Sequence, residues 1–195
     1  MREAHKRERF EELARPQLGA LFRTALRLVG QRAVAEEIVQ DACLRAFASF
    51  NPAEEPTAFR PWLFRIAVNL ALDHLRRMRR EASRTEFDAA TGSAVADATL
   101  TGHPHVQAEG QDIGRALAAA LAGLSPDLRA VTVLVLVEEM SYAEAAVALS
   151  ITVDLVRSRL SRARDELRRR LAAHGADLVS EAMAAPMPAT RRGAS

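Results

Sequence analysis

Two clusters of arginine in this 195-residue chain have the chemistry to bind the phosphates of a nucleic acid. Residues 60–80 contain six arginines and one acid, and residues 157–170 contain seven arginines and two acids. Guanidinium groups form paired hydrogen bonds with phosphate oxygens and with the edge of guanine. Because the net charge is only +2, binding to a polyanion must come from these local clusters and not from a generally basic surface.

The first cluster also contains side chains that suit an unpaired base. The stretch FRPWLFRIAVNLALDHLRRMRR, residues 59–80, has Trp62 near its start, Asn69 in its middle and four arginines at its end, including Arg76 and Arg77. Aromatic rings stack on unstacked bases, and a positively charged groove follows the backbone of a single strand. A helix of this length spans roughly 33 Å, which is enough to separate a base-binding part from a phosphate-binding part.

The sequence contains no motif typical of an enzyme. It has no P-loop, no glycine-rich dinucleotide turn and no H-E-x-x-H. Cys43 is the only cysteine, which excludes an internal disulfide framework, and we interpret it as a small buried residue of a helix. His103 and His105 flank a proline in a stretch without periodicity, where histidines are more often exposed than bound to a metal. We therefore expect no catalysis, no cofactor and no metal.

Charge and hydropathy favour a cytoplasmic protein. The N-terminal stretch MREAHKRERFEEL is charged and lacks the apolar segment of an export signal. No run approaches the roughly 18–20 apolar residues of a membrane span. The single cysteine is consistent with a reducing compartment. We expect no direct contact with a membrane.

Helical periodicity predicts an all-α protein with two small helical domains joined by a flexible linker. The first domain would be a three-helix unit, because GQRA and NPAEEP interrupt the pattern. Its predicted helices cover residues 8–29, 33–50 and 57–80. The predicted parts of the chain are residues 1–80 for the first domain, 81–110 for the linker, 111–173 for the second domain and 174–195 for a disordered tail.

The second domain has the pattern of a helix-turn-helix. Ser125 before a proline predicts the start of one helix, whose continuation AVTVLVLV we interpret as helical although it is rich in β-branched residues. Ser141 and Glu144 form the S-x-x-E capping box that opens a short helix. The turn SIT follows, and Thr152 caps a longer helix that carries many arginines.

That longer helix divides into an inward and an outward face. Val153, Val156, Leu160 and Leu167 form the inward stripe. The outward residues near its start are those that would enter a major groove. They are Arg157, Ser158, Ser161 and Arg162, with Arg164 beside them. The other interpretation, a solvated face with salt bridges, is weakened by the excess of arginine over acid.

The helix predicted over residues 33–50 has an acidic face. Ile38, Val39, Ala42, Ala46 and Phe50 make its core stripe, and Glu36, Glu37, Gln40, Asp41 and Arg45 lie on the other side. An acidic helix next to a basic one indicates two partners, a nucleic acid and a protein with a basic surface. An ordinary solvated face explains this segment equally well.

Three segments in order resemble the extracytoplasmic-function group of bacterial sigma factors. AEEIVQDACLRAF resembles the polymerase-binding part of region 2, and FRPWLFRIAVNLALDHLRR resembles the part that melts promoters and recognises the minus-ten element. LSPDLRAV to RARDELRRRL resembles region 4. The resemblance covers about 130 of the 195 residues and lacks the region 3 of housekeeping sigma factors.

The resemblance implies residue roles in region 2. The docking helix for the coiled coil of the polymerase β′ subunit would present Glu37, Val39, Gln40 and Asp41. The loop NPAEEPTAF, with Trp62 and Asn69, would capture an unstacked minus-ten base, and Arg76 and Arg77 would hold the promoter backbone.

In region 4, the resemblance implies that the minus-thirty-five element is read or positioned by Arg157, Ser158, Ser161 and Arg162. Before this recognition helix the family usually has a glycine and a threonine, where this chain has Asp154 and Leu155. Asp154 places a negative charge near the DNA, although it also suits the positive end of the helix dipole.

The resulting hypothesis is an alternative sigma factor of a bacterial stress response. Its expected partners are core RNA polymerase through the β′ and β subunits, promoter DNA, and an anti-sigma factor that provides the only possible link to a membrane. One alternative is a decoy that binds an anti-sigma factor without binding DNA. Another is a simple helix-turn-helix regulator of duplex DNA, which leaves the acidic helix and the Trp62–Asn69 stretch unexplained.

Overall fold

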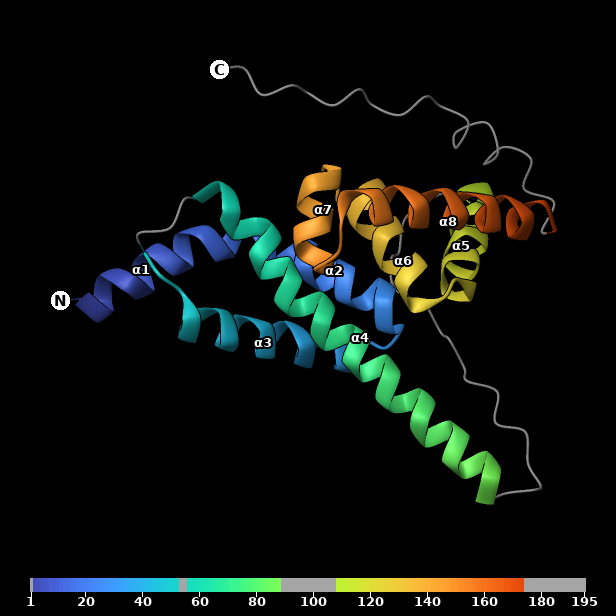
Figure 1. Ribbon diagram of the computed structural model, residues 1–195, viewed down its shortest axis with the longest axis horizontal. Helices are drawn as coiled ribbons and strands as arrows, with labels where there is room; N and C mark the ends of the chain where they lie inside the picture. Colours follow the sequence, from blue (N-terminus) through green and yellow to red (C-terminus); the bar gives the residue numbers. More distant parts are fainter. Residues whose placement is uncertain (1, 53–55, 89–107, 174–195) are drawn as a thin grey trace.

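The computed structural model describes residues 2–52, 56–88 and 108–173, and every regular element within these ranges is helical (Figure 1). The predicted all-α class is confirmed. The elements are α1 (Arg2–Ala14), η1 (Arg15–Gln17), α2 (Leu18–Val29), α3 (Arg32–Ser49), α4 (Pro56–Asp88), α5 (Ala108–Gly123), α6 (Pro126–Thr132), η2 (Val133–Val137), α7 (Tyr142–Leu149) and α8 (Val153–Ala173).

The prediction of one helix over residues 8–29 is wrong. The chain forms α1 and α2 there, joined by the single 3-10 turn η1, so the first domain has four helices in the described residues and not three. Pro16 is the physical reason, because its ring nitrogen has no hydrogen to donate to the carbonyl of Glu12 four residues earlier. α2 ends at Gly30, whose φ of 76° suits a residue without a Cβ and whose N–H donates to the Leu26 carbonyl at 2.8 Å.

The core of the first domain is formed by α2, α3 and α4. On α3 the predicted stripe is buried at Ile38, Ala42 and Ala46, and Phe50 is buried just after the helix, but Val39 is only half-buried. On α4 the apolar residues at helical spacing are buried to different depths. Phe59 and Leu63 are buried, whereas Ile66 and Leu70 are half-buried. The deeper residues of α4 are Phe64, Ala67, Val68 and Ala71.

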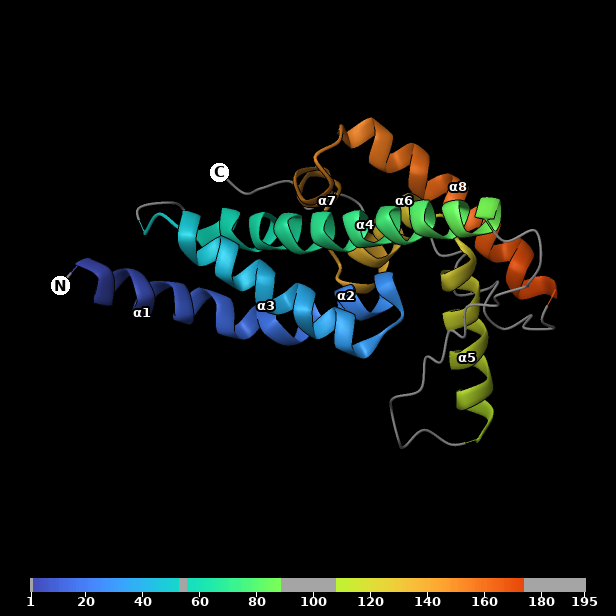
Figure 2. The same ribbon diagram turned by 90° about the horizontal axis from the view of Figure 1, so that it is seen from below.

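These deeper residues of α4 are buried because the helix is covered on two sides. α3 and α7 lie on opposite sides of α4 in both views (Figures 1 and 2). α4 also continues through Asp88 and α5 begins at Ala108, so the predicted linker 81–110 is helical at both of its edges. Its middle, residues 89–107, and the predicted tail, residues 174–195, lie outside the described residues.

The helix-turn-helix signals predicted for the second domain are confirmed. The Ser125 hydroxyl accepts a hydrogen bond from Leu128 N at 3.5 Å, and Thr152 Oγ1 accepts one from Leu155 N at 3.2 Å. Both bonds of the capping box are present, with Ser141 N donating to Glu144 Oε2 at 2.8 Å and Glu144 N donating to Ser141 Oγ at 3.2 Å. The β-branched run is helical, as predicted, and η2 is a π-helix.

The two domains pack on each other. The buried residues of α2, α3 and α4 form one contiguous apolar cluster with those of α6, α7 and the start of α8. A second, smaller cluster joins α5 to the later part of α8. α7 makes the main contact across the two domains, on α4, and we call this surface, together with the flanking residues Arg27, Arg60 and Glu138, the interdomain interface.

We expect Ser141→Ala to lower the free energy of unfolding by about 1 kcal/mol, because the N–H of Glu144 loses its acceptor at the start of α7. Ser83→Ala is the matched control, since Ser83 is an exposed serine on α4. Urea denaturation of both variants measures the difference. Equal stability of the two variants would show that the capping box does not stabilise α7.

Candidate nucleic-acid interface

One face of α4 carries three of the four residues predicted to bind the minus-ten element. Trp62, Asn69 and Arg76 are spaced by seven residues. Each residue is therefore rotated by only about 20° around the helix axis from the one before it and lies about 10 Å further along the helix. Trp62 is half-buried and its ring lies 5.6 Å from that of Phe59, whereas Asn69 is exposed. The structure therefore brings an aromatic ring, an amide and a guanidinium into one row.

The first residue of the row, Trp62, packs on a cluster of aromatic rings. Phe59 contacts Phe10 and Phe50 edge to face, with ring centroids 5.8 and 5.7 Å apart. Such pairs add to the stability gained from burial alone. Because Phe59 also packs on Trp62, the indole is held at a fixed place on α4.

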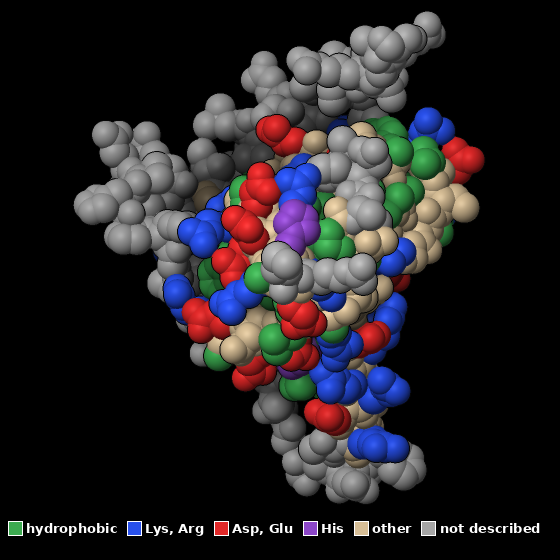
Figure 3. Space-filling view, turned by 90° about the vertical axis from the view of Figure 1, so that its left-hand side faces the viewer, with side chains coloured by type: hydrophobic (Ala, Val, Ile, Leu, Met, Phe, Trp, Pro, Cys, Tyr) green, Lys and Arg blue, Asp and Glu red, His purple; other side chains and the backbone are tan. Residues whose placement is uncertain are grey.

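The end of α4 is basic and exposed. Arg76, Arg77, Arg79 and Arg80 are all exposed there, and this part of the helix projects from the bundle (Figure 1). Figure 3 shows arginines gathered on that projection and acidic side chains over the N-terminal helices. Arg76 forms an ion pair with Asp73 at 2.7 Å, but both side chains are more than half exposed. Such a pair is weak enough for a phosphate to replace it.

α8 presents the second set of predicted residues. Val156, Leu160 and Leu167 form its inward face, and each of these side chains is at most 1% exposed. Val153, predicted to belong to the same face, is half-buried. The predicted minus-thirty-five residues point away from this core. Arg157, Ser161 and Arg162 are exposed, and Ser158 is half-buried.

Arg157 is held by two neighbours that face the same side. Its Nη1 lies 2.9 Å from Asp154 Oδ1, and its guanidinium lies 5.9 Å from the centroid of the Tyr142 ring. Tyr142 also lines a shallow hollow with Arg157 and Ser161 on the surface of α8. Asp154, the departure noted in the sequence, therefore pairs with an arginine near the start of α8.

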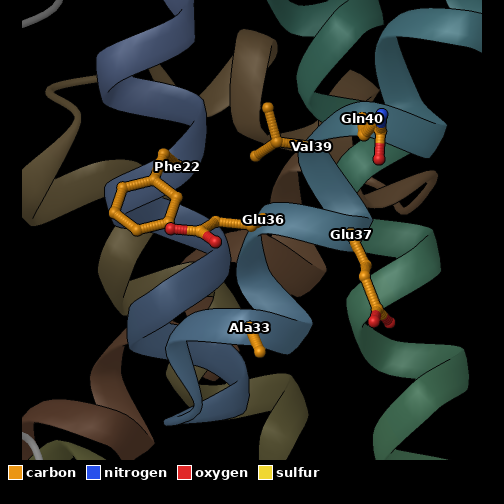
Figure 4. Close-up of a pocket in the computed structure, with 6 residues that line it drawn as sticks. All are labelled: Phe22, Ala33, Glu36, Glu37, Val39 and Gln40. Atoms are coloured by element: carbon orange, nitrogen blue, oxygen red, sulfur yellow. The ribbon is translucent and has the colours of Figure 1, made fainter.

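The predicted polymerase-binding residues lie together on α3. Glu37, Gln40 and Asp41 are exposed, and Asp41 is 3.6 Å from Arg45. Half-buried Val39 lines a shallow pocket whose other wall is Phe22 of α2 (Figure 4). Arg32 covers the Phe22 ring at 5.5 Å and pairs with Glu36 at 2.8 Å. Leu44 on the same helix is 65% exposed, an unusual place for a leucine.

Within the described residues, no group of histidine, cysteine, aspartate and glutamate side chains is arranged to hold a metal ion. The helices of that same part of the chain include none that is long and apolar enough to cross a membrane. The predicted base-capturing loop 51–59 is described only in part, because residues 53–55 lie outside the described ranges.

Comparison with known proteins identifies the family. Residues 13–81 match the family described as Sigma-70 region 2, and residues 114–167 match Sigma-70, region 4. The RNA polymerase sigma-E factor of Streptomyces coelicolor is 32% identical over 169 residues, which cover 86% of this chain and 89% of that protein. The ECF RNA polymerase sigma factor SigW of Bacillus subtilis is 29% identical over 157 residues, which cover 77% of this chain and 82% of that protein. The chain belongs to the extracytoplasmic-function sigma factors.

A longer relative and two solved structures agree with this assignment. The ECF RNA polymerase sigma factor SigE of Mycolicibacterium smegmatis is 34% identical over 89% of this chain, which spans 65% of that relative's length. RpoE of Bartonella quintana, solved with the anti-sigma factor NepR, superposes with a TM-score of 0.61 at 28% identity over 84% of this chain and 96% of that one. CnrH, solved with the cytosolic domain of CnrY, superposes with a TM-score of 0.59 at 25% identity. The superposition covers 88% of this chain and 97% of that one.

In sigma-factor terms, α2, α3 and most of α4 form region 2, and most of α5, with α6 to α8, forms region 4. Three residues at the candidate surfaces were missed by sequence reasoning. Phe22 and Tyr142 reach these surfaces from other helices, which periodicity cannot reveal. Leu44 was detectable, because it is a large apolar residue on the polar face of α3.

Cys43 lies on α3 among the candidate docking residues, and burial raises the pKa of its thiol. We therefore expect iodoacetamide to modify the folded protein at pH 8 several-fold more slowly than the urea-unfolded chain, because less thiolate is present. The rate for the folded protein should rise to its plateau at a higher pH. Mass spectrometry measures both rates, and equal pH profiles would contradict the raised pKa.

Proposed function

We propose that this sigma factor binds core RNA polymerase, directs it to a set of promoters and helps to open the DNA there. The observation that carries the proposal is the separation of three outward surfaces on one chain: the Trp62–Asn69–Arg76 row of α4, the start of α8, and the acidic face of α3. The protein would contribute no catalytic step and would act in the cytoplasm, where polymerase and promoter meet.

The α4 row suits a promoter that is being opened. We assign Trp62 and Asn69 to an unstacked minus-ten base and Arg76 and Arg77 to the backbone of the strand. Unstacking costs a few kcal/mol, and stacking on an aromatic side chain returns about 1–3 kcal/mol per base. The flanking arginines supply the remaining attraction, since exposed guanidinium groups bind phosphates.

The start of α8 suits the duplex of the minus-thirty-five element. We assign Arg157 and Arg162 to guanine edges or to phosphates, and Ser158 and Ser161 to the close approach of the helix to the bases. Asp154 and Arg157 form an ion pair at 2.9 Å, and both side chains are more than half exposed, so a phosphate can replace this pair as well.

The α3 face suits a protein with a basic and partly apolar surface. Glu37, Gln40 and Asp41 offer acceptors, while Val39 and the exposed Leu44 offer apolar contact. Interfaces combine such an apolar centre with a polar rim. We assign this face to the β′ subunit of core polymerase, and region 4 to a contact with the β subunit.

An anti-sigma factor is the proposed regulator. Two structural neighbours, RpoE and CnrH, were solved in complex with NepR and with the cytosolic domain of CnrY. An inhibitor that covers the α3 face or the arginine surfaces would compete directly with polymerase and promoter. A membrane-bound inhibitor would be the chain's only link to a membrane.

Arg157→Ala and Arg162→Ala should each abolish promoter selectivity, with a loss of about 1–3 kcal/mol for the preferred minus-thirty-five duplex, while binding to core polymerase is unchanged. Arg115→Ala is the matched control, since Arg115 is exposed on α5 of the same domain. Fluorescence anisotropy with specific and scrambled duplexes measures the preference. An equal loss of duplex and polymerase binding would overturn this division of roles.

Glu37→Ala combined with Asp41→Ala should weaken binding to core polymerase at least tenfold and leave the affinity for the minus-thirty-five duplex unchanged. Glu12→Ala, an exposed acid on α1, is the control. Co-elution from a sizing column and a titration with labelled polymerase measure the change. Unchanged polymerase binding would show that the acidic face of α3 is an ordinary solvated surface.

A further inference from the structure

One leucine near the start of α8 lies outside the core. Leu155 is 37% exposed, whereas the large apolar side chains that follow it on the helix are at most 2% exposed: Val156, Leu160, Leu167 and Leu171. A single exposed leucine is common on a protein surface and needs no function. Leu155 differs in its position, because it lies in the first turn of the helix that is proposed to enter the major groove.

Leu155 shares one face of α8 with Ser158 and Arg162. Ser158 lies about 60° around the helix axis from Leu155, and Arg162, seven residues after Leu155, lies only about 20° around it. The serine side chain is too small to cover the leucine. The Arg162 side chain is exposed, and its guanidinium has no hydrogen bond or ion pair within the described residues. This row therefore joins an apolar group to a free cation about 10 Å further along the helix.

The contacts that stabilise the first turn of α8 do not use the Leu155 side chain. Thr152 Oγ1 accepts a hydrogen bond from the backbone N–H of Leu155 at 3.2 Å, and Asp154 pairs with Arg157 at 2.9 Å. Side chains on a helix tilt toward its N-terminus, so the leucine extends toward the tip of α8. In a helix-turn-helix that tip is the part of the recognition helix that reaches base edges.

A leucine side chain can recognise one feature of the base edges in a major groove. It neither donates nor accepts hydrogen bonds, and the apolar group on those edges is the C5-methyl of thymine. Against the other three bases it would leave polar atoms without a partner. The surface around Leu155 carries the exposed cations Arg157 and Arg162, which attract a polyanion and so favour DNA as the partner over an apolar protein surface.

We propose that Leu155 is a specificity-determining residue that contacts the C5-methyl group of a thymine in the minus-thirty-five element. The proposal rests on the function proposed above for the start of α8. Because the row is about 10 Å long and base pairs are stacked about 3.4 Å apart, this thymine lies within about three base pairs of the nucleotide that Arg162 contacts. One buried methyl group, at roughly 0.8 kcal/mol, corresponds to about a fourfold difference in affinity.

The test removes the methyl group and keeps every hydrogen-bonding group of the base. The full-length protein first selects its preferred duplex from a random library, and each thymine of that duplex is then replaced in turn by uracil. Competition binding measures the affinities. For the wild-type chain, uracil at one thymine should weaken binding about fourfold. Leu155→Ala should bind the thymine duplex about fourfold more weakly and should no longer distinguish thymine from uracil there.

Three controls separate this contact from a general weakening. Leu117→Ala is the matched variant, because Leu117 is a leucine of α5 in the same domain that is 36% exposed, and it should keep the fourfold difference. Leu155→Met keeps an apolar chain and should keep most of the difference. The slope of log affinity against log salt should be the same for Leu155→Ala and wild type, whereas one lost phosphate contact would reduce it by about 0.9. Alanine favours a helix, so Leu155→Ala should remain folded.

A preferred duplex without thymine, a difference below twofold at every thymine, or an unchanged difference in Leu155→Ala would each overturn the proposal. Weaker binding of Leu155→Ala to core polymerase with an unchanged thymine preference would also overturn it, because the leucine would then contact protein. A wild-type chain that selects no duplex sequence, alone or with core polymerase, would refute the function proposed for the start of α8 as well.

Discussion

The whole structure depends on α4 being covered from two sides. This 33-residue helix spans about 50 Å, and its buried residues contact α2 and α3 on one side and α7 on the other. Phe64, at 0% exposure, is the largest fully buried side chain of this helix. Truncating a buried phenylalanine typically costs 3–5 kcal/mol, a large share of the stability of a small domain. The row proposed to bind DNA occupies the remaining face of the same helix, so the core fixes the direction of the binding residues.

The contact between the domains combines two opposing effects. Apolar burial between α7 and α4 favours the packing of the two domains, at roughly 25 cal/mol for each Å² removed from water. The buried charge of Glu138 and the half-buried charge of Arg27 oppose it, because each loses water and has a buried atom without a hydrogen-bond partner among the described residues. Apolar packing therefore supplies the attraction, and the charges determine where the domains meet.

Sequence reasoning succeeded where the deciding interactions are local. Ser125, the capping box of Ser141 with Glu144, and Thr152 each act within three residues, and the structure contains all of these bonds. It failed where tertiary packing decides. Val39 shares the spacing of the α3 core but lies at its edge. Pro16 breaks the helix between α1 and α2, but the residues around it keep helical spacing, so periodicity alone predicts one continuous helix there.

The interdomain interface could not be predicted from sequence patterns. Arg60 and Glu138 are 78 residues apart, and Arg129 and Leu28 are 101 apart. Glu138 belongs to a short acidic pair after an apolar run, which reads as an exposed turn. It is buried where the second domain packs on the first, near Arg60 of α4 and Arg27 of α2. The candidate sites can be proposed from the sequence, because arginine and asparagine stand out at polar helical positions and Trp62 is the one tryptophan of the sequence.

Transcription in vitro from fragmented bacterial genomic DNA tests the central claim most directly. Purified core polymerase would be assayed with and without this protein, and the starts of the transcripts would be mapped. A sigma factor predicts new starts that share two spaced upstream elements, near minus ten and minus thirty-five. The absence of new starts, together with no binding to core polymerase at low salt, would contradict the account.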